Sequence, residues 1–218
     1  MGLNTSWWKT KVQNTGYGLP PITIQVMMNT VKATESFTYL GSATDSSGRS
    51  SHDVHHRIGL ASSVMDRLYN IWRQPRLSLS TKLRLYNVYV VSVLLYSCET
   101  WVSLQSDERR FEAFHMTCHR RILGVRWHHF DTNTGAVLDQ TTVESIMSRI
   151  QRRRKSVFDH VRRLPKQTPA HAALCLAVDT HSGRKRDNKH HRRHPRGRPR
   201  RTWIQQIEVD SGLSAEPV

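Results

Sequence analysis

SLSTKLRLYNVYVVSVLLYSCETW, residues 78–101, is the most apolar stretch of the chain and decides the fold. Apolar residues recur at spacings of three and four between Leu83 and Leu94, and a second apolar stripe runs beside the first. The pattern predicts one buried helix over the whole stretch, with Ser78 or Ser80 as its N-cap. The other elements are expected to pack around this helix.

Two alternatives to a buried helix follow from the same residues. The β-branched residues also suit a pair of buried strands, but about twenty residues without Gly or Pro exceed the usual strand length of roughly four to eight. A membrane span is excluded, because Lys82, Arg84 and Asn87 leave too few consecutive apolar positions to cross a bilayer.

Amphipathic helices are predicted on both sides of this stretch. One runs from His52 to Gln74 and stops at Pro75, and the other begins near Ser106 and ends at Gly124. The first should bury Val54, Ile58, Ala61, Met65, Leu68 and Trp72 and expose Arg57, Asp66, Arg67 and Asn70. The second should bury Phe111, Phe114, Cys118, Ile122 and Leu123.

The N-terminal part has the alternation and the turn residues of β structure. Lys9–Gln13 is a candidate strand, Ile22–Val26 forms a hairpin with the residues after a turn at Asn29-Thr30, and a third strand ends at Leu40-Gly41. Residues 46–51 are predicted to be a loop.

A basic helix is predicted from Thr142 to Leu164, before Pro165. Its inward residues are Ile146, Ile150, Val157, Phe158 and Val161, and its outward residues are Arg149, Arg152, Arg153, Arg154, Lys155, Arg162 and Arg163. Residues 180–218 are expected to be a disordered basic tail, since they are too poor in apolar residues to fold alone. The fold class is therefore α+β and mainly helical, divided into segments 1–50, 51–128, 129–179 and 180–218.

The charge is unevenly distributed. Between Arg149 and Trp203 the chain carries 18 Lys and Arg against 3 Asp and Glu, whereas the remainder carries 15 against 14. A basic segment without an amphipathic or lipidated anchor favours RNA or DNA, contacted mainly through phosphates, over a membrane. Three distant cysteines and the absence of a signal peptide predict reduced thiols in a nuclear or cytoplasmic protein that is not secreted.

Several strings resemble a known family when they are taken in order and at their spacing. GLNTSWWKTK at 2–11, FTYLGS at 37–42, TKLRLY at 81–86 with YSCETW at 96–101, RRILGVRW at 120–127 and GRPRRTW at 197–203 are similar to the downstream part of reverse transcriptases of non-LTR retrotransposons, most closely the RTE type. The resemblance covers nearly the whole chain.

The resemblance implies roles for particular residues. Lys9 would lie near the triphosphate of the incoming nucleotide and protonate the leaving pyrophosphate. A primer-grip hairpin would contain Phe37, Tyr39, Leu40 and Gly41, and the helices between 52 and 124 would form the thumb.

The metal-binding aspartates of that family do not occur in this sequence. Polymerase chemistry uses two Mg²⁺ ions held by aspartates, one pair of them in a Tyr-x-Asp-Asp turn, and this chain has no Asp-Asp. We therefore expect a catalytically incompetent polymerase remnant that binds no cofactor of its own and does not polymerise by itself.

The sharpest local motif is Arg196-Gly197-Arg198-Pro199-Arg200, which resembles an AT-hook core. Two arginines around a glycine suit a narrow A·T-rich minor groove. The alternative is a basic segment that contacts phosphate without specificity or acts as a nuclear-import signal. Arg152, Arg153, Arg154, Lys155, Arg201 and Trp203 complete the predicted nucleic-acid-binding set.

Histidines and tryptophans give weaker signals. His190, His191 and His194 have cationic neighbours that repel a metal, and no further ligand pair matches the spacing of His115 and His119, so no metal site is predicted. Trp72, Trp101 and Trp127 are read as packing residues, whereas Trp203 is the better candidate for stacking on a base.

The function expected from these residues is sequence-tolerant nucleic-acid binding by the polymerase remnant. Two alternatives stay open: a stand-alone AT-hook-like chromatin protein, and a fragment of a longer, active reverse transcriptase.

Overall fold

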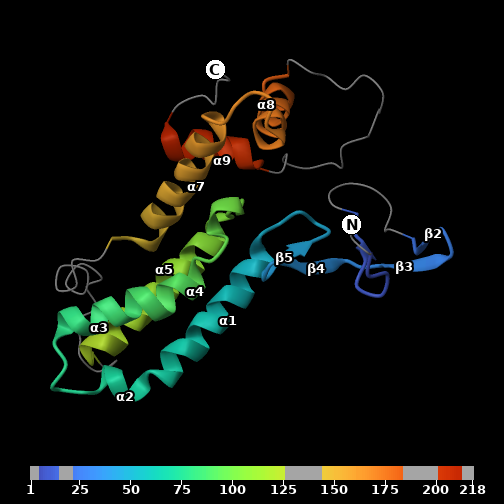
Figure 1. The fold of residues 1–218 in the computed structure, drawn as a ribbon. Helices are drawn as coiled ribbons and strands as arrows, with labels where there is room; N and C mark the ends of the chain where they lie inside the picture. The colour runs from blue at the N-terminus through green and yellow to red at the C-terminus, as the bar shows by residue number, and fades with distance from the viewer. Residues whose placement is uncertain (1–4, 15–21, 126–143, 184–200, 213–218) are drawn as a thin grey trace. The chain divides into compact units, whose positions relative to one another are not determined.

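The computed structural model describes residues 5–14, 22–125, 144–183 and 201–212. These residues form an α+β fold in which helices predominate and short strands occupy the N-terminal part, as the sequence predicts. The chain divides into two compact units (Figure 1). Unit 1 comprises Met1–Tyr96 and Ser103–Thr141, and unit 2 comprises Ser97–Val102 and Thr142–Val218.

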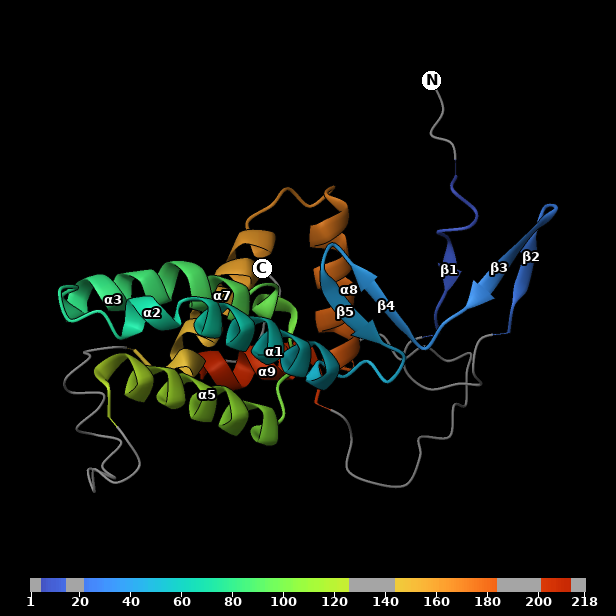
Figure 2. The same cartoon turned by 90° about the horizontal axis from the view of Figure 1, so that it is seen from below.

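The strands of unit 1 form two small sheets (Figure 2). Their bounds are β1 Lys11–Val12, β2 Ile24–Val26, β3 Asn29–Ala33, β4 Ser36–Tyr39 and β5 Ser42–Asp45. The first sheet has the order β1-β3-β2, with β1 parallel and β2 antiparallel to β3. The second sheet is the antiparallel hairpin β4-β5.

Three details of the predicted β structure were wrong. The pairing of Val26 with Asn29 places the first turn at Met27-Met28 rather than at Asn29-Thr30, and this register buries Val31. The first strand begins only at Lys11, because the backbone N–H of Thr10 bonds back to the Ser6 carbonyl at 3.0 Å and closes a turn. Strand β5 was not predicted at all.

The flanking helices follow the predicted periodicity. Helix α1 spans Ser51–Arg67 and the short α2 spans Tyr69–Trp72, and together they bury Val54, Ala61, Met65 and Trp72. Helix α5, Gln105–Leu123, buries Phe111, Cys118 and Ile122. Its end at Gly124 needs a left-handed residue with φ 73°, which glycine adopts without a steric penalty.

The central apolar stretch is not one continuous helix. Helix α3, Leu79–Leu85, begins at Ser78, whose hydroxyl accepts the Thr81 N–H at 3.2 Å as predicted. The backbone then widens into a π-helix, Tyr86–Val91, before the short α4, Ser92–Leu94.

The helical part of the stretch does not continue past Ser97, because Ser97 adopts a left-handed conformation with φ 64°. A 3₁₀ turn, Cys98–Thr100, follows, and the chain passes into unit 2. The stretch is also less buried than predicted, since Val88 and Tyr89 are more than half exposed. The β-branched run at this point lowers helix propensity, which agrees with the break in α-helical geometry.

Unit 2 is helical in the part that the structure describes. Helix α7 spans Ile146–Arg162, α8 spans Pro169–His181 and α9 spans Trp203–Ser211. Its buried apolar residues are Cys98, Trp101, Ile146, Ile150, Phe158, Val178, Ile204 and Ile207. Helix α9 corrects the prediction that residues 180–218 do not fold, because Ile204 and Ile207 give it an apolar face that packs on α7 and α8.

Candidate nucleic-acid interface

The β4-β5 hairpin presents apolar side chains to solvent near its tip. The exposed fractions are 37% for Phe37, 65% for Tyr39 and 74% for Leu40, all of them primer-grip residues by resemblance. The turn consists of Leu40 and Gly41, with φ of 49° and 81°. Two left-handed residues at a two-residue turn match the right-handed twist of the strands that they connect.

The backbone of this turn is tied to the helices of unit 1. The Tyr96 hydroxyl donates to the Leu40 carbonyl at 2.6 Å, and the Arg57 guanidinium donates to the Gly41 carbonyl. The guanidinium also lies over the Tyr96 ring, 4.4 Å from its centroid. Both carbonyls of the turn are therefore fixed by side chains from distant positions in the sequence.

Asp53 fixes the strand that follows the turn. Its carboxylate accepts the Ala43 N–H at 3.0 Å and the Ser42 hydroxyl at 3.1 Å, and one of its oxygens lies 3.6 Å from the Arg57 Nε. Both charged side chains are almost completely buried. The hairpin is thus held on its backbone side while Phe37, Tyr39 and Leu40 remain exposed.

The buried state of Arg57 contradicts the prediction that it faces solvent. The sequence contained a signal for this burial. Arg57 follows Val54 by three positions and therefore lies on the apolar face of its own helix. An acidic partner at i−4, Asp53, was a second signal. Tyr96 was noted only as part of the apolar stretch.

Lys9 lies in the turn before β1 and is exposed. Its ammonium group is 4.7 Å from the centroid of the Trp8 ring. Nothing in this arrangement assigns it a chemical role.

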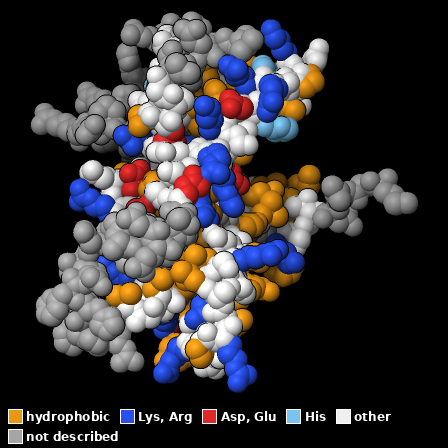
Figure 3. All heavy atoms as spheres, turned by 90° about the vertical axis from the view of Figure 1, so that its left-hand side faces the viewer, with side chains coloured by type: hydrophobic (Ala, Val, Ile, Leu, Met, Phe, Trp, Pro, Cys, Tyr) orange, Lys and Arg blue, Asp and Glu red, His pale blue; other side chains and the backbone are white. Residues whose placement is uncertain are grey.

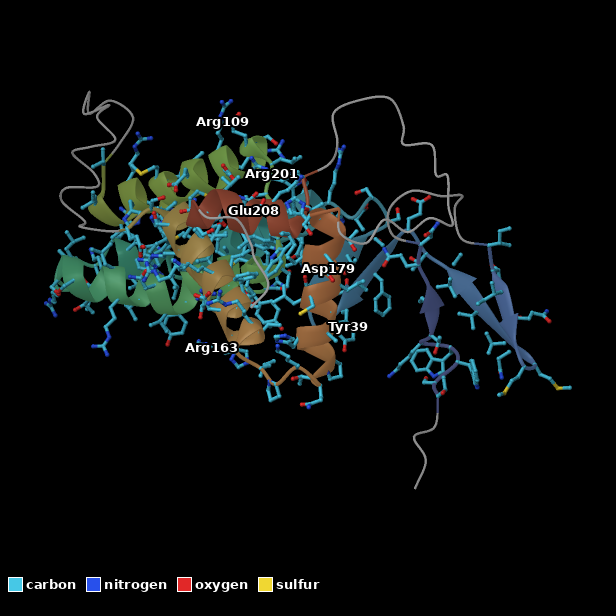
Figure 4. The ribbon with its side chains drawn as sticks, turned by 90° about the horizontal axis from the view of Figure 1, so that it is seen from above. Tyr39, Arg109, Arg163, Asp179, Arg201 and Glu208 are labelled. Carbon is cyan, nitrogen blue, oxygen red and sulfur yellow. The ribbon has the colours of Figure 1, made fainter. Side chains whose placement is uncertain are left out.

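Helix α7 supplies the described part of the basic surface in unit 2. Arg152, Arg153 and Lys155 are exposed along the helix, and Arg162, Arg163 and Lys166 are exposed at and beyond its end. Figure 4 shows Arg163 where α7 ends. Lys and Arg side chains also lie across the face of the molecule drawn in Figure 3, with carboxylates between several of them.

Arg154 does not belong to this surface, which corrects its predicted role in binding. Its side chain is completely buried and forms an ion pair with Asp210, which is 2% exposed. The Gln206 amide donates to the same carboxylate at 3.0 Å. Helix α9 brings Asp210 onto α7, and a buried guanidinium needs such a partner because an unpaired buried charge is costly.

Trp203 takes part in the packing of unit 2, and its side chain is only partly exposed. Its indole N–H donates to the Glu99 carbonyl at 2.8 Å, and its ring lies beside Phe158 with the centroids 6.2 Å apart. It is the first residue of α9, whose N-cap Thr202 forms a reciprocal capping box with Gln205. Arg201, just before the cap, is exposed, and its guanidinium donates to the side-chain amide oxygen (Oε1) of Gln206 at 3.1 Å.

The motif from Arg196 to Arg200 and the histidines at 190, 191 and 194 lie outside the described residues. The flanks of this basic segment are described. His181 ends α8, and its Nε2 lies 3.0 Å from a carboxylate oxygen of Glu208 on α9. The basic segment therefore connects two helices that contact each other. Figure 4 labels Arg201, just before α9, and Glu208 on that helix.

His115 and His119 form a buried aromatic cluster with Tyr86 on the inner side of α5. The Tyr86 hydroxyl is 2.8 Å from the His115 Nδ1, and the two imidazole centroids are 4.3 Å apart. Burial raises the pKa of the neighbouring Cys118 thiol to about 12, and it raises that of Cys98 in unit 2 to about 11. Among the described residues, no group of three or more His, Cys, Asp or Glu side chains is placed to hold a metal ion.

Comparisons with protein-family models, with curated proteins and with solved structures gave no match. Within the described ranges, no helix combines the length and the apolar character needed to cross a membrane.

Proposed function

We propose that this protein binds nucleic acid through its phosphates, using the exposed cations of α7 and the basic residues between 184 and 200, and that it does not polymerise nucleotides on its own. The observation that carries this proposal is the gathering of Arg152, Arg153, Lys155, Arg162 and Arg163 on the outer side of one helix. Guanidinium and ammonium groups bind phosphate oxygens without reading the bases, so the binding is tolerant of sequence.

The hairpin of unit 1 is proposed as a second contact. Phe37 and Tyr39 are two positions apart on β4, so they project from the same face of the strand. Exposed aromatic rings on a rigid backbone suit stacking on an unpaired base or sugar. The family resemblance supports the same role through the primer grip.

The experiment compares two charge-matched triple variants of the full chain. Lys155→Glu/Arg162→Glu/Arg163→Glu changes α7, and Lys32→Glu/Arg76→Glu/Arg84→Glu changes three exposed cations of unit 1. Fluorescence anisotropy with a labelled 20-mer at several salt concentrations gives affinity and salt slope. The α7 variant should lower the slope by about 3, since each phosphate contact contributes roughly 0.9, and weaken binding at least about tenfold.

Equal losses in both variants would show that only net charge matters and would contradict the proposed interface. Primer extension with Mg²⁺ and a template–primer duplex is expected to give no product from the chain alone. Any extension by the purified polypeptide would refute the proposed lack of catalysis.

A second candidate, part of a longer reverse transcriptase, is favoured by the first sheet. Trp8, Ile22, Met27 and Met28, in the segments next to its strands, are each more than three-quarters exposed, and a polymerase palm supplied by further polypeptide would cover such residues. The test is whether an in-frame Tyr-x-Asp-Asp sequence precedes this reading frame in its transcript, and whether the joined protein extends a primer.

A further inference from the structure

Glu144 pairs with two arginines at the start of the basic helix. It stands directly before the N-cap Ser145, whose hydroxyl accepts the Met147 N–H at 3.2 Å. One carboxylate oxygen contacts the Arg152 guanidinium, and the other lies 3.7 Å from the Arg149 Nε. The carboxylate and Arg152 are both accessible, at 39% and 66% exposed.

The two ends of α7 differ in whether their cations are paired with a carboxylate. Lys155, Arg162 and Lys166 form no ion pair with any residue that the structure describes. Arg149 and Arg152, in the first two turns, in contrast share the carboxylate of Glu144. Because a carboxylate and a phosphate use the same guanidinium N–H groups, a phosphate that approaches Arg149 and Arg152 must compete with Glu144.

The pairing is not required for the fold. Exposed ion pairs contribute little to stability, since they are screened by solvent and salt. The N-cap hydrogen bond of Ser145 does not involve the Glu144 side chain. The larger effect of Glu144 is therefore on whatever anion approaches this end of the helix.

We propose that Glu144 is an internal competitor for the nucleic-acid backbone, which occupies Arg149 and Arg152 until a phosphate displaces it. This inference rests on the proposed function. It makes the C-terminal end of α7 the first point of contact and the N-terminal end a second point that is used only when the polyanion displaces the carboxylate.

The central test is Glu144→Gln, which keeps the size and polarity of the side chain and removes its charge. We expect tighter binding of a labelled single-stranded or duplex 20-mer, by about three- to tenfold at 100 mM salt, and a steeper salt dependence by up to about 2 phosphate equivalents. Two controls change the net charge equally: Glu35→Gln, an exposed residue of unit 1, and Asp159→Asn on α7, whose carboxylate forms no ion pair with an arginine among the described residues. Both should change affinity by less than about twofold.

A pair of double substitutions separates competition from general electrostatics. Arg149→Gln/Arg152→Gln should weaken binding only slightly when Glu144 is present. Adding Arg149→Gln/Arg152→Gln to the Glu144→Gln variant should abolish completely the gain in affinity that Glu144→Gln produces. Circular dichroism should show the same helix content in all variants.

The outcomes distinguish this inference from the proposed function. If the unchanged protein binds and the Lys155→Glu/Arg162→Glu/Arg163→Glu variant does not, but Glu144→Gln binds no more tightly than the controls, the competition by Glu144 is refuted and the interface stands. If the unchanged protein does not bind at all, the proposed function itself fails.

Discussion

The carbon of the Arg57 guanidinium lies 4.4 Å from the centroid of the Tyr96 ring, and these two side chains hold the two carbonyls at the tip of the β4-β5 hairpin. One residue comes from α1 and the other from just beyond α4, so the hairpin is fixed by segments remote in sequence. The backbone at the tip of the hairpin is therefore fixed, while the side chains of Phe37, Tyr39 and Leu40 stay exposed.

Removing the Arg57 side chain should release the hairpin. Arg57→Ala leaves Asp53 buried without its cation, and we expect a loss of about 3 kcal/mol in the free energy of unfolding of unit 1. Hydrogen exchange at the Ala43 amide should become faster as well. Tyr96→Phe is the matched control, because it removes only the hydrogen bond to Leu40 and should cost about 1 kcal/mol. Equal effects of the two changes would contradict this view of the hairpin anchor.

Asp210→Asn should destabilise unit 2 much more than an exposed carboxylate change. It leaves the Arg154 guanidinium buried with a neutral partner, which should cost about 3–5 kcal/mol in urea or thermal unfolding. Replacing both residues, Arg154→Met/Asp210→Leu, should recover most of this loss and leave nucleic-acid binding unchanged. A binding defect in the folded double variant would show that Arg154 contributes to nucleic-acid binding after all.

The three cysteines should differ in reactivity. Cys175 is partly exposed and should react first with a maleimide or a disulfide reagent at neutral pH, whereas Cys98 and Cys118 should react only after unfolding. The Cys175→Ser variant is the control that identifies the fast thiol.

The same burial predicts how stability depends on pH. The pKa values of Cys98 and Cys118 are raised from 9.0 to about 11 and about 12, so above pH 9 the unfolded chain loses protons that the folded chain retains. This stabilising contribution is complete below pH 9 and is lost as the pH rises toward 11–12. The free energy of unfolding should fall by up to about 1.4 kcal/mol per pH unit for each thiol. Urea titrations between pH 8 and 10.5 measure this slope, and a Cys118→Ala variant should show a smaller one.

A comparison of A·T-rich with G·C-rich duplex tests whether the motif from Arg196 to Arg200 binds the minor groove. If it enters the minor groove, A·T-rich duplex should bind more tightly than G·C-rich duplex at the same salt, and Gly197→Val should remove the preference with little loss of total affinity. Replacing the cations of residues 184–200 by Gly and Ser, with Trp203 kept, should lower binding to both duplexes. If the unchanged protein shows no preference for A·T-rich duplex, the motif binds through phosphate contacts only.

Periodicity was sufficient to predict the fold class and the amphipathic helices. Val54, Ala61 and Met65 in α1, and Phe111, Cys118 and Ile122 in α5, lie where spacings of three and four place them. The Ser78 cap and the Gly124 stop were also correct, since both depend on local backbone chemistry.

Sequence patterns failed where a distant partner decides the outcome. Arg57 and Arg154 were assigned to solvent as charged residues, but Asp53 and the Gly41 carbonyl make the burial of Arg57 favourable, and Asp210 does the same for Arg154. Trp203 lies in a basic run and was therefore predicted to stack on a base, whereas its indole contacts residues about fifty and a hundred positions earlier, Phe158 and Glu99. The pairings of Arg154 and Trp203 are tertiary and leave no periodic trace in the sequence, whereas Arg57 had a local signal in Val54 and Asp53 of its own helix.

Ser97–Val102 belongs to unit 2, although the residues on both sides of it belong to unit 1. The hexapeptide contributes Cys98, the Glu99 carbonyl and Trp101 to a core that is completed by α9, about a hundred positions later in the sequence. During synthesis on the ribosome, this core cannot close until Trp203 to Asp210 have left the exit tunnel. A protein cut between the hexapeptide and α9 would depend on reassociation of the two pieces, and a stop codon before Trp203 would leave the Glu99 carbonyl and Arg154 without their partners on α9.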